Sequence, residues 1–448
     1  MKINKLVLSV FLFGLLLRLI LIPFGNHGDI LSLANWGKWI YLNGPLGFYE
    51  HKVWTYAWPT QLPVFNFLMV FAYVGYYQTL ELMRWLTFNI VPHLAPGHML
   101  WWFDWVKWWE SAFVPQSPFL PLTDLHYGFI MWIKILPIIA DLILAMIIYH
   151  FGKKHLNATK ALLISFLFLF LPSSWYLSSL WGQYDQIASL LLIGSFFILS
   201  KRYFLFSAIL SFLAIQTKPT TGFFLPFYVF YFLRQKPNLR NIISSLLGIG
   251  TIFWFTTMPF STRNPFEYTY NVILRSVLGD RWLLANHAFN FWAFLIPQVE
   301  KSTILILGLP AFIWATLFLI GFNTWSIILV AKRNDLKHLL VALYLVGGGS
   351  YLFYIGQLDR YFFPVIFILG LLNFYYPKLL KLWVITCILY SINLFYSWGF
   401  PYLSNNKNWQ DLNLIRIFSL AQVLVFLACL NQMRLVQYKR IPFLNKKT

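Results

Sequence analysis

The sequence predicts an all-α, multi-pass membrane protein with about twelve transmembrane helices. Of its 448 residues, 59% are hydrophobic, 21% are aromatic and only 11% are charged. A soluble domain carries about 25% charged residues, and a disordered chain lacks so many aromatic residues. Apolar runs of about 18 or more residues recur from end to end, whereas the short alternating segments of a β-barrel are not visible. The composition therefore excludes a soluble fold and a disordered chain.

Twelve apolar segments are the expected spans of one membrane domain that covers residues 1–448. Several are shorter than about 20 residues, so tilt or interfacial aromatic residues must make up the difference. The first follows Lys2 and Lys5 as a signal peptide would, but no small-residue cleavage site follows it, so we expect it to be retained. The twelve segments are 6–23, 128–150, 160–178, 184–200, 203–217, 220–233, 241–259, 303–330, 339–355, 361–376, 382–400 and 412–433.

The basic residues predict the orientation of these spans, because cytoplasmic connections are enriched in Lys and Arg. Both termini and alternate connections hold 20 of the 34 basic residues, with Asp335 as the one acid among them. We therefore expect this face and both termini to be cytoplasmic. The net charge of +20 then reflects membrane topology and not binding to nucleic acid. Nearly every carboxylate lies on the opposite face or at its boundary, so chemistry that needs acids is expected there.

Two long loops are predicted on that outer face, 24–127 and 260–302. In the first loop, apolar residues from 30 to 41 recur at helical spacing. The apolar run 62–77 is bounded by a proline and is about 16 residues long, which suits an interfacial or re-entrant helix. Residues 99–109 are rich in tryptophan, as is typical of a segment at the level of lipid headgroups. We therefore expect interfacial helices in these loops.

Two acidic segments at the outer boundary are candidates for chemistry. Asp29 directly follows the first span and begins an amphipathic stretch. It is either a helix N-cap or a general base. The second interpretation is reasonable because a helix N-terminus favours the ionised form of a carboxylate. The segment 181–185, Trp-Gly-Gln-Tyr-Asp, starts the fourth span. It is either a pair of interfacial aromatics with a capping acid, or a sugar-binding wall in which Trp181 stacks and Gln183 and Asp185 bond to hydroxyl groups.

Basic residues at the same boundary are candidates for binding a phosphate. Lys218 precedes a proline between the fifth and sixth spans, and a cation at membrane depth is costly enough to suggest a function; the alternative is snorkelling to headgroups. The second loop adds three arginines and His287, although a solvated loop explains them too. The pair Asp359-Arg360 suits a structural salt bridge. Asp141, inside the second span, is either a buried polar contact or part of an outer cavity.

These pieces, in this order, resemble the GT-C superfamily of polyprenyl-phosphate-sugar-dependent glycosyltransferases. The likeness is greatest to the glucosyl- and mannosyltransferases of lipid-linked glycan assembly and extends over about residues 1–365. The matching pieces are the acidic start 28–36, the proline-rich stretch 58–63, the second span at 138–142, the segment 181–185, the lysine-bearing hairpin 214–226, the mobile outer loop 259–292 and the pair Arg360-Tyr361.

The chain departs from the family pattern at two places. Relatives commonly carry His-Glu-Arg-Tyr where this chain has Leu-Asp-Arg-Tyr at 358–361, so a histidine contact to the donor phosphate is missing. Asp29 also lacks a second acid two residues on, where Leu31 stands, which argues against a metal requirement.

The two cysteines, Cys387 and Cys429, lie within apolar runs and have no metal-type spacing.

The resemblance implies an inverting transfer of a hexose, mannose or glucose, from a polyprenyl- or dolichyl-phosphate donor to an acceptor hydroxyl. The acceptor would be a glycan, a lipid or a protein, no cofactor or metal would be needed, and nucleic acid is not an expected partner. The site would face outward from a prokaryotic cytoplasmic membrane or into the endoplasmic reticulum lumen. The implied roles are general base for Asp29, donor-phosphate binding for Lys218, Arg360 and His287, and sugar or acceptor binding for Trp181, Gln183 and Asp185.

Two other functions fit a chain with many spans. A secondary transporter or lipid flippase agrees with both termini inside, but the two halves show no paired repeat and the long outer loops have no role in alternating access. A membrane polysaccharide polymerase or ligase agrees with arginines in outer loops, but not with an acid directly after the first span.

Reporter fusions test the predicted topology. Fusions after Lys154, Arg202 and Lys236 should read cytoplasmic, because these positions follow the basic connections. Fusions within 90–120 and 265–295 should read extracytoplasmic. A cytoplasmic signal from 90–120 would mean that the apolar run before it crosses the membrane, and the assignment of the outer face would then be wrong.

Overall fold

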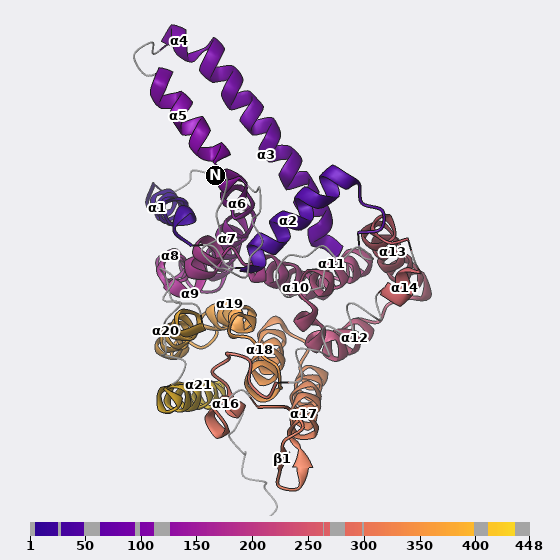
Figure 1. Ribbon diagram of the computed structural model, residues 1–448. Coiled ribbons are helices and arrows are strands. Elements are labelled where there is room, and N and C mark those ends of the chain that lie inside the picture. Colours follow the sequence, from indigo (N-terminus) through magenta and orange to yellow (C-terminus); the bar gives the residue numbers. More distant parts are fainter. Residues whose placement is uncertain are drawn as a thin grey trace, which may run out of the picture. The chain divides into compact units, whose positions relative to one another are not determined.

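The computed structural model describes residues 5–25, 28–48, 63–94, 99–111, 126–262, 264–268, 283–297, 300–397 and 411–434 (Figure 1). These residues are almost entirely helical. The strands among them form one small hairpin, in which β1 (Leu305–Ile306) pairs antiparallel with β2 (Leu309–Pro310). The prediction of an all-α fold is confirmed.

Seven helices in the described part of the chain are long and apolar enough to cross a membrane, and an eighth is added if the bent pair 158–170 and 172–181 is one span. The expected spans at 184–200 and 203–217 are shorter apolar helices. The chain is therefore an all-α, multi-pass membrane protein by helix length and composition, and the count of twelve spans stays a prediction. The seven helices cover Lys5–Phe24, Tyr127–His155, Leu239–Phe260, Ala311–Lys332, Leu336–Phe353, Leu379–Ser397 and Leu412–Gln432.

The chain folds into two compact units, and neither is continuous in sequence. The first unit comprises residues 1–146 and 174–281, and the second comprises 147–173 and 282–448. The prediction of a single membrane domain with outer loops at 24–127 and 260–302 stays a prediction. The helices of the first unit are α1 (Lys5–Leu21), η1 (Ile22–Phe24), α2 (Gly28–Asn43), α3 (Pro63–Asn89), α4 (Val91–Leu94), α5 (Met99–Glu110), α6 (Tyr127–Ile133), the start of α7 (Ile135–His155), the end of α9 (Pro172–Trp175), η3 (Tyr176–Trp181), α10 (Asp185–Ser200), α11 (Phe204–Thr217), η4 (Pro219–Phe224), α12 (Leu225–Arg234), α13 (Leu239–Thr257), η5 (Met258–Phe260) and α14 (Pro265–Tyr268).

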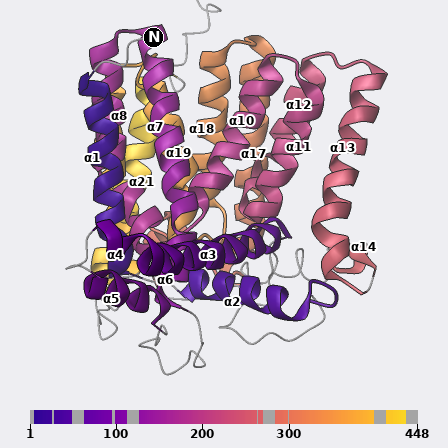
Figure 2. The ribbon, with the colours of Figure 1, turned by 90° about the horizontal axis from the view of Figure 1, so that it is seen from above.

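Helices α2 and α3 run across the direction that α1, α10, α11 and α13 share (Figure 2). The two crossing helices approach closely where Gly37 of α2 meets Met69 of α3, since a Cβ at Gly37 would lie 2.8 Å from the Met69 Cβ. Ile30, Ala34 and Tyr76 are buried in the core between them and α6. The placement of these helices along a membrane surface, and the side of that membrane, stay predictions.

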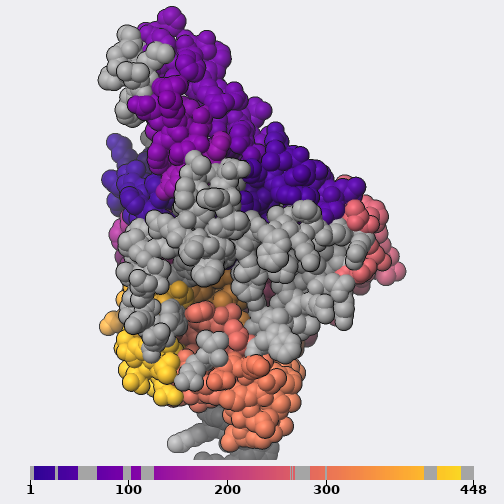
Figure 3. All heavy atoms as spheres, viewed as in Figure 1, coloured from indigo at the N-terminus to yellow at the C-terminus, as the bar shows by residue number. Residues whose placement is uncertain are grey.

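Helix α3 continues to Asn89 and is therefore longer than the apolar run 62–77 that predicts it. The apolar run ends at the first polar residues, and α3 continues through them. Arg84 forms an ion pair with Glu81 one turn away, and its Nε lies 2.7 Å from the Glu110 Oε1 on α5. Beyond α4, α5 folds back beside α3, and Figure 3 shows this arm in purple. Trp85, Phe88 and Trp108 are exposed on it.

A buried ion pair joins α1 to α7. The Arg18 Nε lies 3.0 Å from the Asp141 Oδ2, and both side chains are fully buried. Arg18 also donates to the Gly14 carbonyl and, at 2.8 Å, to the Ser174 hydroxyl, while the Ser178 hydroxyl donates to the Asp141 Oδ2 at 2.7 Å. Of the two interpretations of Asp141, the structure favours the buried helix contact.

The second unit is built around α18 (Leu336–Phe353), which is buried along its whole length from 339 to 352. Gly348 and Gly349 make this packing possible, since a Cβ at either position would lie 2.4 Å or less from the ring of Phe426 or Phe322. The other helices of the second unit are the end of α7, α8 (Ala158–Phe170), the start of α9, α16 (Phe291–Leu295), α17 (Ala311–Lys332), η8 (Asp359–Phe362), α19 (Phe363–Leu372), α20 (Leu379–Ser397) and α21 (Leu412–Gln432).

The Arg18–Asp141 pair generates a stability prediction. Arg18→Met should lower the free energy of unfolding by about 3–5 kcal/mol, because it leaves the Asp141 carboxylate buried without its counterion. Adding Asp141→Leu should recover most of this loss, because no buried charge then remains. Thermal unfolding in detergent measures both effects. A double variant that is no more stable than Arg18→Met would contradict the ion-pair interpretation.

Candidate functional site

Asp29 lies in the first turn of α2, which begins at Gly28. Its side chain is half-buried, and its Oδ2 accepts a hydrogen bond of 2.8 Å from the Gln183 Nε2, 154 residues away. Backbone N–H groups at a helix N-terminus and a donating amide both stabilise a carboxylate in its ionised form. The hydrogen bond therefore holds the Asp29 carboxylate at a defined place, which serves either interpretation of this residue.

The segment that carries Gln183 is shaped by a π-helical turn and a glycine. The π-helical η3 ends at Trp181 and is followed by Gly182 in the left-handed conformation, with φ +72°. A side chain at this position would be strained by the positive φ, and its Cβ would lie 2.2 Å from the Ile30 Cδ1 of α2. π-Helical turns are frequent at functional sites. Beyond the glycine, the buried Tyr184 hydroxyl donates to the Ile133 carbonyl of α6 at 3.0 Å, so the segment is fixed from both sides.

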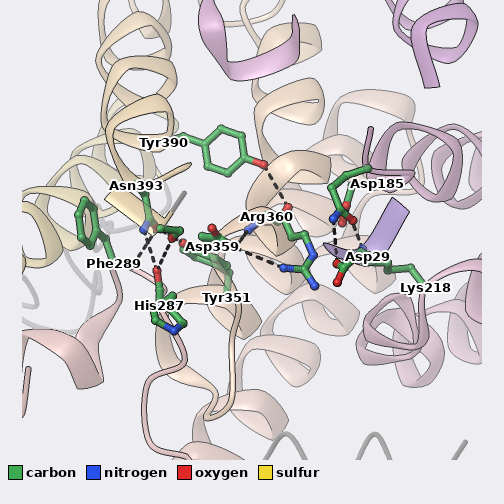
Figure 4. Close-up of polar contacts among 12 residues, drawn as sticks. Asp29, Asp185, Lys218, His287, Phe289, Tyr351, Asp359, Arg360, Tyr390 and Asn393 are labelled. Atoms are coloured by element: carbon green, nitrogen blue, oxygen red, sulfur yellow. Dashed lines mark hydrogen bonds and ion pairs between the residues drawn. The ribbon is translucent and has the colours of Figure 1, made fainter. Parts of the chain in front are cut away.

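Asp185 and Lys218 form a half-enclosed ion pair. The Lys218 Nζ lies 2.9 Å from the Asp185 Oδ2, and the two side chains are 12% and 4% exposed. The position of Lys218 follows from Pro219, because a residue before proline is driven out of the helical region. Lys218 adopts φ −146° and ψ 104°, and α11 accordingly ends at Thr217. Figure 4 shows Lys218 pointing at Asp185, with Asp29 beside the pair.

Trp181 is the last residue of η3 and is only 4% exposed. Its ring contacts Tyr176 edge-on, with 5.7 Å between ring centroids. The structure therefore places Trp181 within the packing beneath the segment that carries Gln183. Its proposed stacking against a sugar stays a prediction.

In the second unit, Asp359 and Arg360 begin the short helix η8. The Asp359 Oδ1 lies 3.7 Å from the Arg360 Nη1 and accepts the Arg360 backbone N–H at 2.8 Å. Asp359 is buried, which raises the pKa of its carboxyl, and the Arg360 charge opposes that shift. The ion pair is observed as the sequence suggests. Tyr390 of α20 donates to the Arg360 carbonyl at 3.1 Å and so fixes the turn.

His287 has a left-handed backbone, with φ +66°, which is uncommon for a residue other than glycine. Asn393 of α20 holds it there. The Asn393 Nδ2 donates to the His287 carbonyl at 2.7 Å, while its Oδ1 accepts the Phe289 N–H at 2.9 Å and the Tyr351 hydroxyl at 2.8 Å (Figure 4). One buried amide thus clamps both sides of the loop that carries the imidazole.

The structure brings five of the seven candidates into the first unit and places His287 and Arg360 in the second. Gln183 joins Asp29 directly, and Lys218 joins Asp185. Arg263, Arg275, Arg281 and most of the proline-rich stretch 58–63 lie outside the described residues. Among those that are described, no three His, Cys, Asp or Glu side chains are grouped to hold a metal ion.

Two polar residues that the sequence analysis did not single out have structural roles beside these candidates. Lys134 lies in the second expected span and Asn393 in the eleventh. The signal that marks both is a polar side chain inside an apolar segment, which is costly unless it has partners. The partners themselves, 42 to 112 residues away, are visible only in the fold.

The chain matches no protein-family model and no curated protein.

The Asn393 clamp generates a testable prediction. Asn393→Leu keeps the side-chain volume but removes all three hydrogen bonds, and each buried polar group left without a partner costs about 1–3 kcal/mol. We expect the free energy of unfolding to fall by about 2–5 kcal/mol, measured by thermal unfolding in detergent. Ser391→Ala is the matched control on the same helix, because the Ser391 hydroxyl donates to the Cys387 carbonyl of its own helix. Equal effects of both changes would show that Asn393 is not a clamp.

Proposed function

We propose that this chain is an inverting glycosyltransferase of the GT-C type, which transfers a hexose from a polyprenyl-phosphate donor to an acceptor hydroxyl on the extracytoplasmic or lumenal side of its membrane. The observation that supports this most is the hydrogen bond between Gln183 and Asp29, at 2.8 Å. It joins the acid that follows the first long apolar helix to the segment whose Asp185 pairs with Lys218. Three regions far apart in sequence, each named by the resemblance, thus contribute polar groups to one place.

In the proposed reaction, Asp29 is the general base. The acceptor oxygen attacks the anomeric carbon as its proton moves to the Asp29 carboxylate, and the bond from that carbon to the phosphate oxygen breaks with its electron pair leaving on the phosphate. A single displacement of this kind inverts the anomeric configuration. The Gln183 amide fixes the rotation of the Asp29 carboxylate by bonding one of its oxygens. Positioned proton transfer is typically worth about 10²–10⁴-fold in rate.

Lys218 is the proposed cation for the leaving phosphate in the first unit. Its charge is balanced by Asp185, so an incoming phosphate would share or replace that carboxylate as the partner of the ammonium group. A lipid phosphate leaves as a monoester, whose charge side chains can stabilise without a divalent ion. Arg360 and His287 remain the proposed phosphate ligands of the second unit, and Trp181, Gln183 and Asp185 the proposed sugar or acceptor ligands.

The donor would be a mannosyl- or glucosyl-phosphate polyprenol or dolichol, and the acceptor a glycan, a lipid or a protein. The purified protein should release polyprenyl phosphate from one of these donors and glycosylate an added acceptor. This assay separates the proposal from the competing functions. A flippase would move the lipid across a vesicle without releasing polyprenyl phosphate, and a polymerase or ligase would not use the monophosphate donor.

The decisive variant is Asp29→Asn, which keeps the size of the side chain but cannot accept the proton. We expect turnover to fall by about 10²-fold or more with little change in KM for the donor, because the base acts only in the transition state. Steady-state kinetics with the lipid donor measure this. Asp104→Asn, which changes an exposed carboxylate on α5, is the matched control and should leave turnover unchanged.

Asp29→Asn also separates the base from a helix cap. Asparagine caps as well as aspartate does, so a pure capping role requires fold and activity to survive the change together. Thermal unfolding, recorded on the same preparation, distinguishes lost chemistry from lost structure. Near-normal turnover in Asp29→Asn would refute the assignment of Asp29 as the base, and Asp185 would become the candidate.

A further inference from the structure

Lys134 lies at the junction between α6 and α7 and is fully buried. Its Nζ donates to the carbonyl of Ile22 at 2.9 Å, to the carbonyl of Leu180 at 3.1 Å and to the carbonyl of Gly25. A protonated amine has three N–H donors, which matches the three carbonyl acceptors around the Lys134 Nζ. Burying such a charge is costly unless it is compensated in this way.

The three carbonyls belong to the two segments that carry Asp29 and Gln183. Ile22 and Gly25 precede Asp29 by seven and four residues, and Leu180 precedes Gln183 by three. The segments are in direct contact at this point. A Cβ added at Gly25 would lie 2.9 Å from the Leu180 carbonyl oxygen. The Asp29–Gln183 hydrogen bond therefore forms directly beyond a junction of two backbones that Lys134 holds together.

A glycine on the second segment also adapts it to this lysine. A Cβ at Gly182 would lie 3.0 Å from the Lys134 Cγ, in addition to its clash with Ile30. The stem of the lysine thus fills the space against Gly182 while its ammonium reaches past to the carbonyls. An apolar residue at 134 would fill the same volume but leave three buried carbonyls without these donors.

We propose that Lys134 is the positioning residue of the Asp29–Gln183 pair: its ammonium group joins the two backbone segments so that the carboxylate and the amide meet. Its effect on turnover rests on the proposed function, whereas the junction itself does not. Without the cation the two segments separate, and the Asp29 carboxylate is displaced relative to Gln183. A displacement of about 1 Å at a reacting group costs about 10²-fold in rate.

The test compares three variants of the full-length protein. Lys134→Met keeps an unbranched apolar stem but has no donor, and Lys134→Arg keeps a cation with several donors. The matched control is the double variant Arg18→Met/Asp141→Leu, which removes a buried ion pair between α1 and α7 in the same unit. Hydrogen–deuterium exchange is followed in residues 22–31 and 177–186, together with thermal unfolding and with kcat and KM for the lipid donor.

We expect Lys134→Met to increase exchange at least about tenfold in both segments and, per folded protein, to lower kcat about 10²-fold with KM for the donor little changed. Relative to Lys134→Met, Lys134→Arg should restore part of the protection from exchange and part of kcat. The control should keep most of its thermal stability and show no selective loss of kcat. If Lys134→Met does not accumulate as folded protein, Lys134→Gln, which keeps an amide donor, carries the same comparison.

Two results would overturn the proposal. Unchanged exchange in both segments of Lys134→Met would mean that the ammonium group does not join them. Raised exchange with unchanged kcat would mean that the junction does not position the reacting carboxylate. A wild-type protein that releases no polyprenyl phosphate would instead refute the proposed glycosyltransferase function, and the exchange measurement would still decide whether the junction exists.

Discussion

The arrangement of the first unit depends on the cost of a charge in an apolar interior. Arg18, Lys134 and Lys218 all lie in or beside apolar helices, and each is balanced by groups distant in sequence. Apolar helices in lipid gain little from burying one face or another, so packing alone specifies their register weakly. A buried cation specifies the helix arrangement more strongly than apolar packing does, because an arrangement that leaves it without acceptors loses several kcal/mol of stability. The partners of these three cations thus specify which helices and turns meet.

The class of fold was predictable because composition and run length alone determine it. The number and the length of the helices were harder to predict, because polar residues interrupt the apolar pattern without ending a helix. Arg84 illustrates the reason: it lies beyond the apolar run that ends at residue 77, yet its partners Glu81 and Glu110 compensate its charge within α3. The partners lie on two helices, and only one of them is near enough in sequence to be paired with Arg84 by helical spacing.

The candidate site was likewise predictable only in part. Asp29, Gln183, Asp185 and Lys218 were identifiable because each breaks an apolar pattern at one predicted face, and the resemblance supplied their order. Which of them meet was not predictable, and the structure pairs Lys218 with Asp185, although the two had been given separate roles. Lys134 and Asn393 also broke apolar runs, but their partners are mainly backbone groups, which carry no sequence signature. The backbone acceptors of a site are thus the groups that are hardest to predict from the sequence.

The choice of acceptors at Lys134 has a consequence for how this part of the molecule responds to acid. The ion pairs of Arg18 with Asp141 and of Lys218 with Asp185 each use an acidic side chain as the acceptor. Peptide carbonyls do not take up protons at any pH that a cell membrane meets. The three acceptors that hold the segments of Asp29 and Gln183 together therefore do not change with acidity.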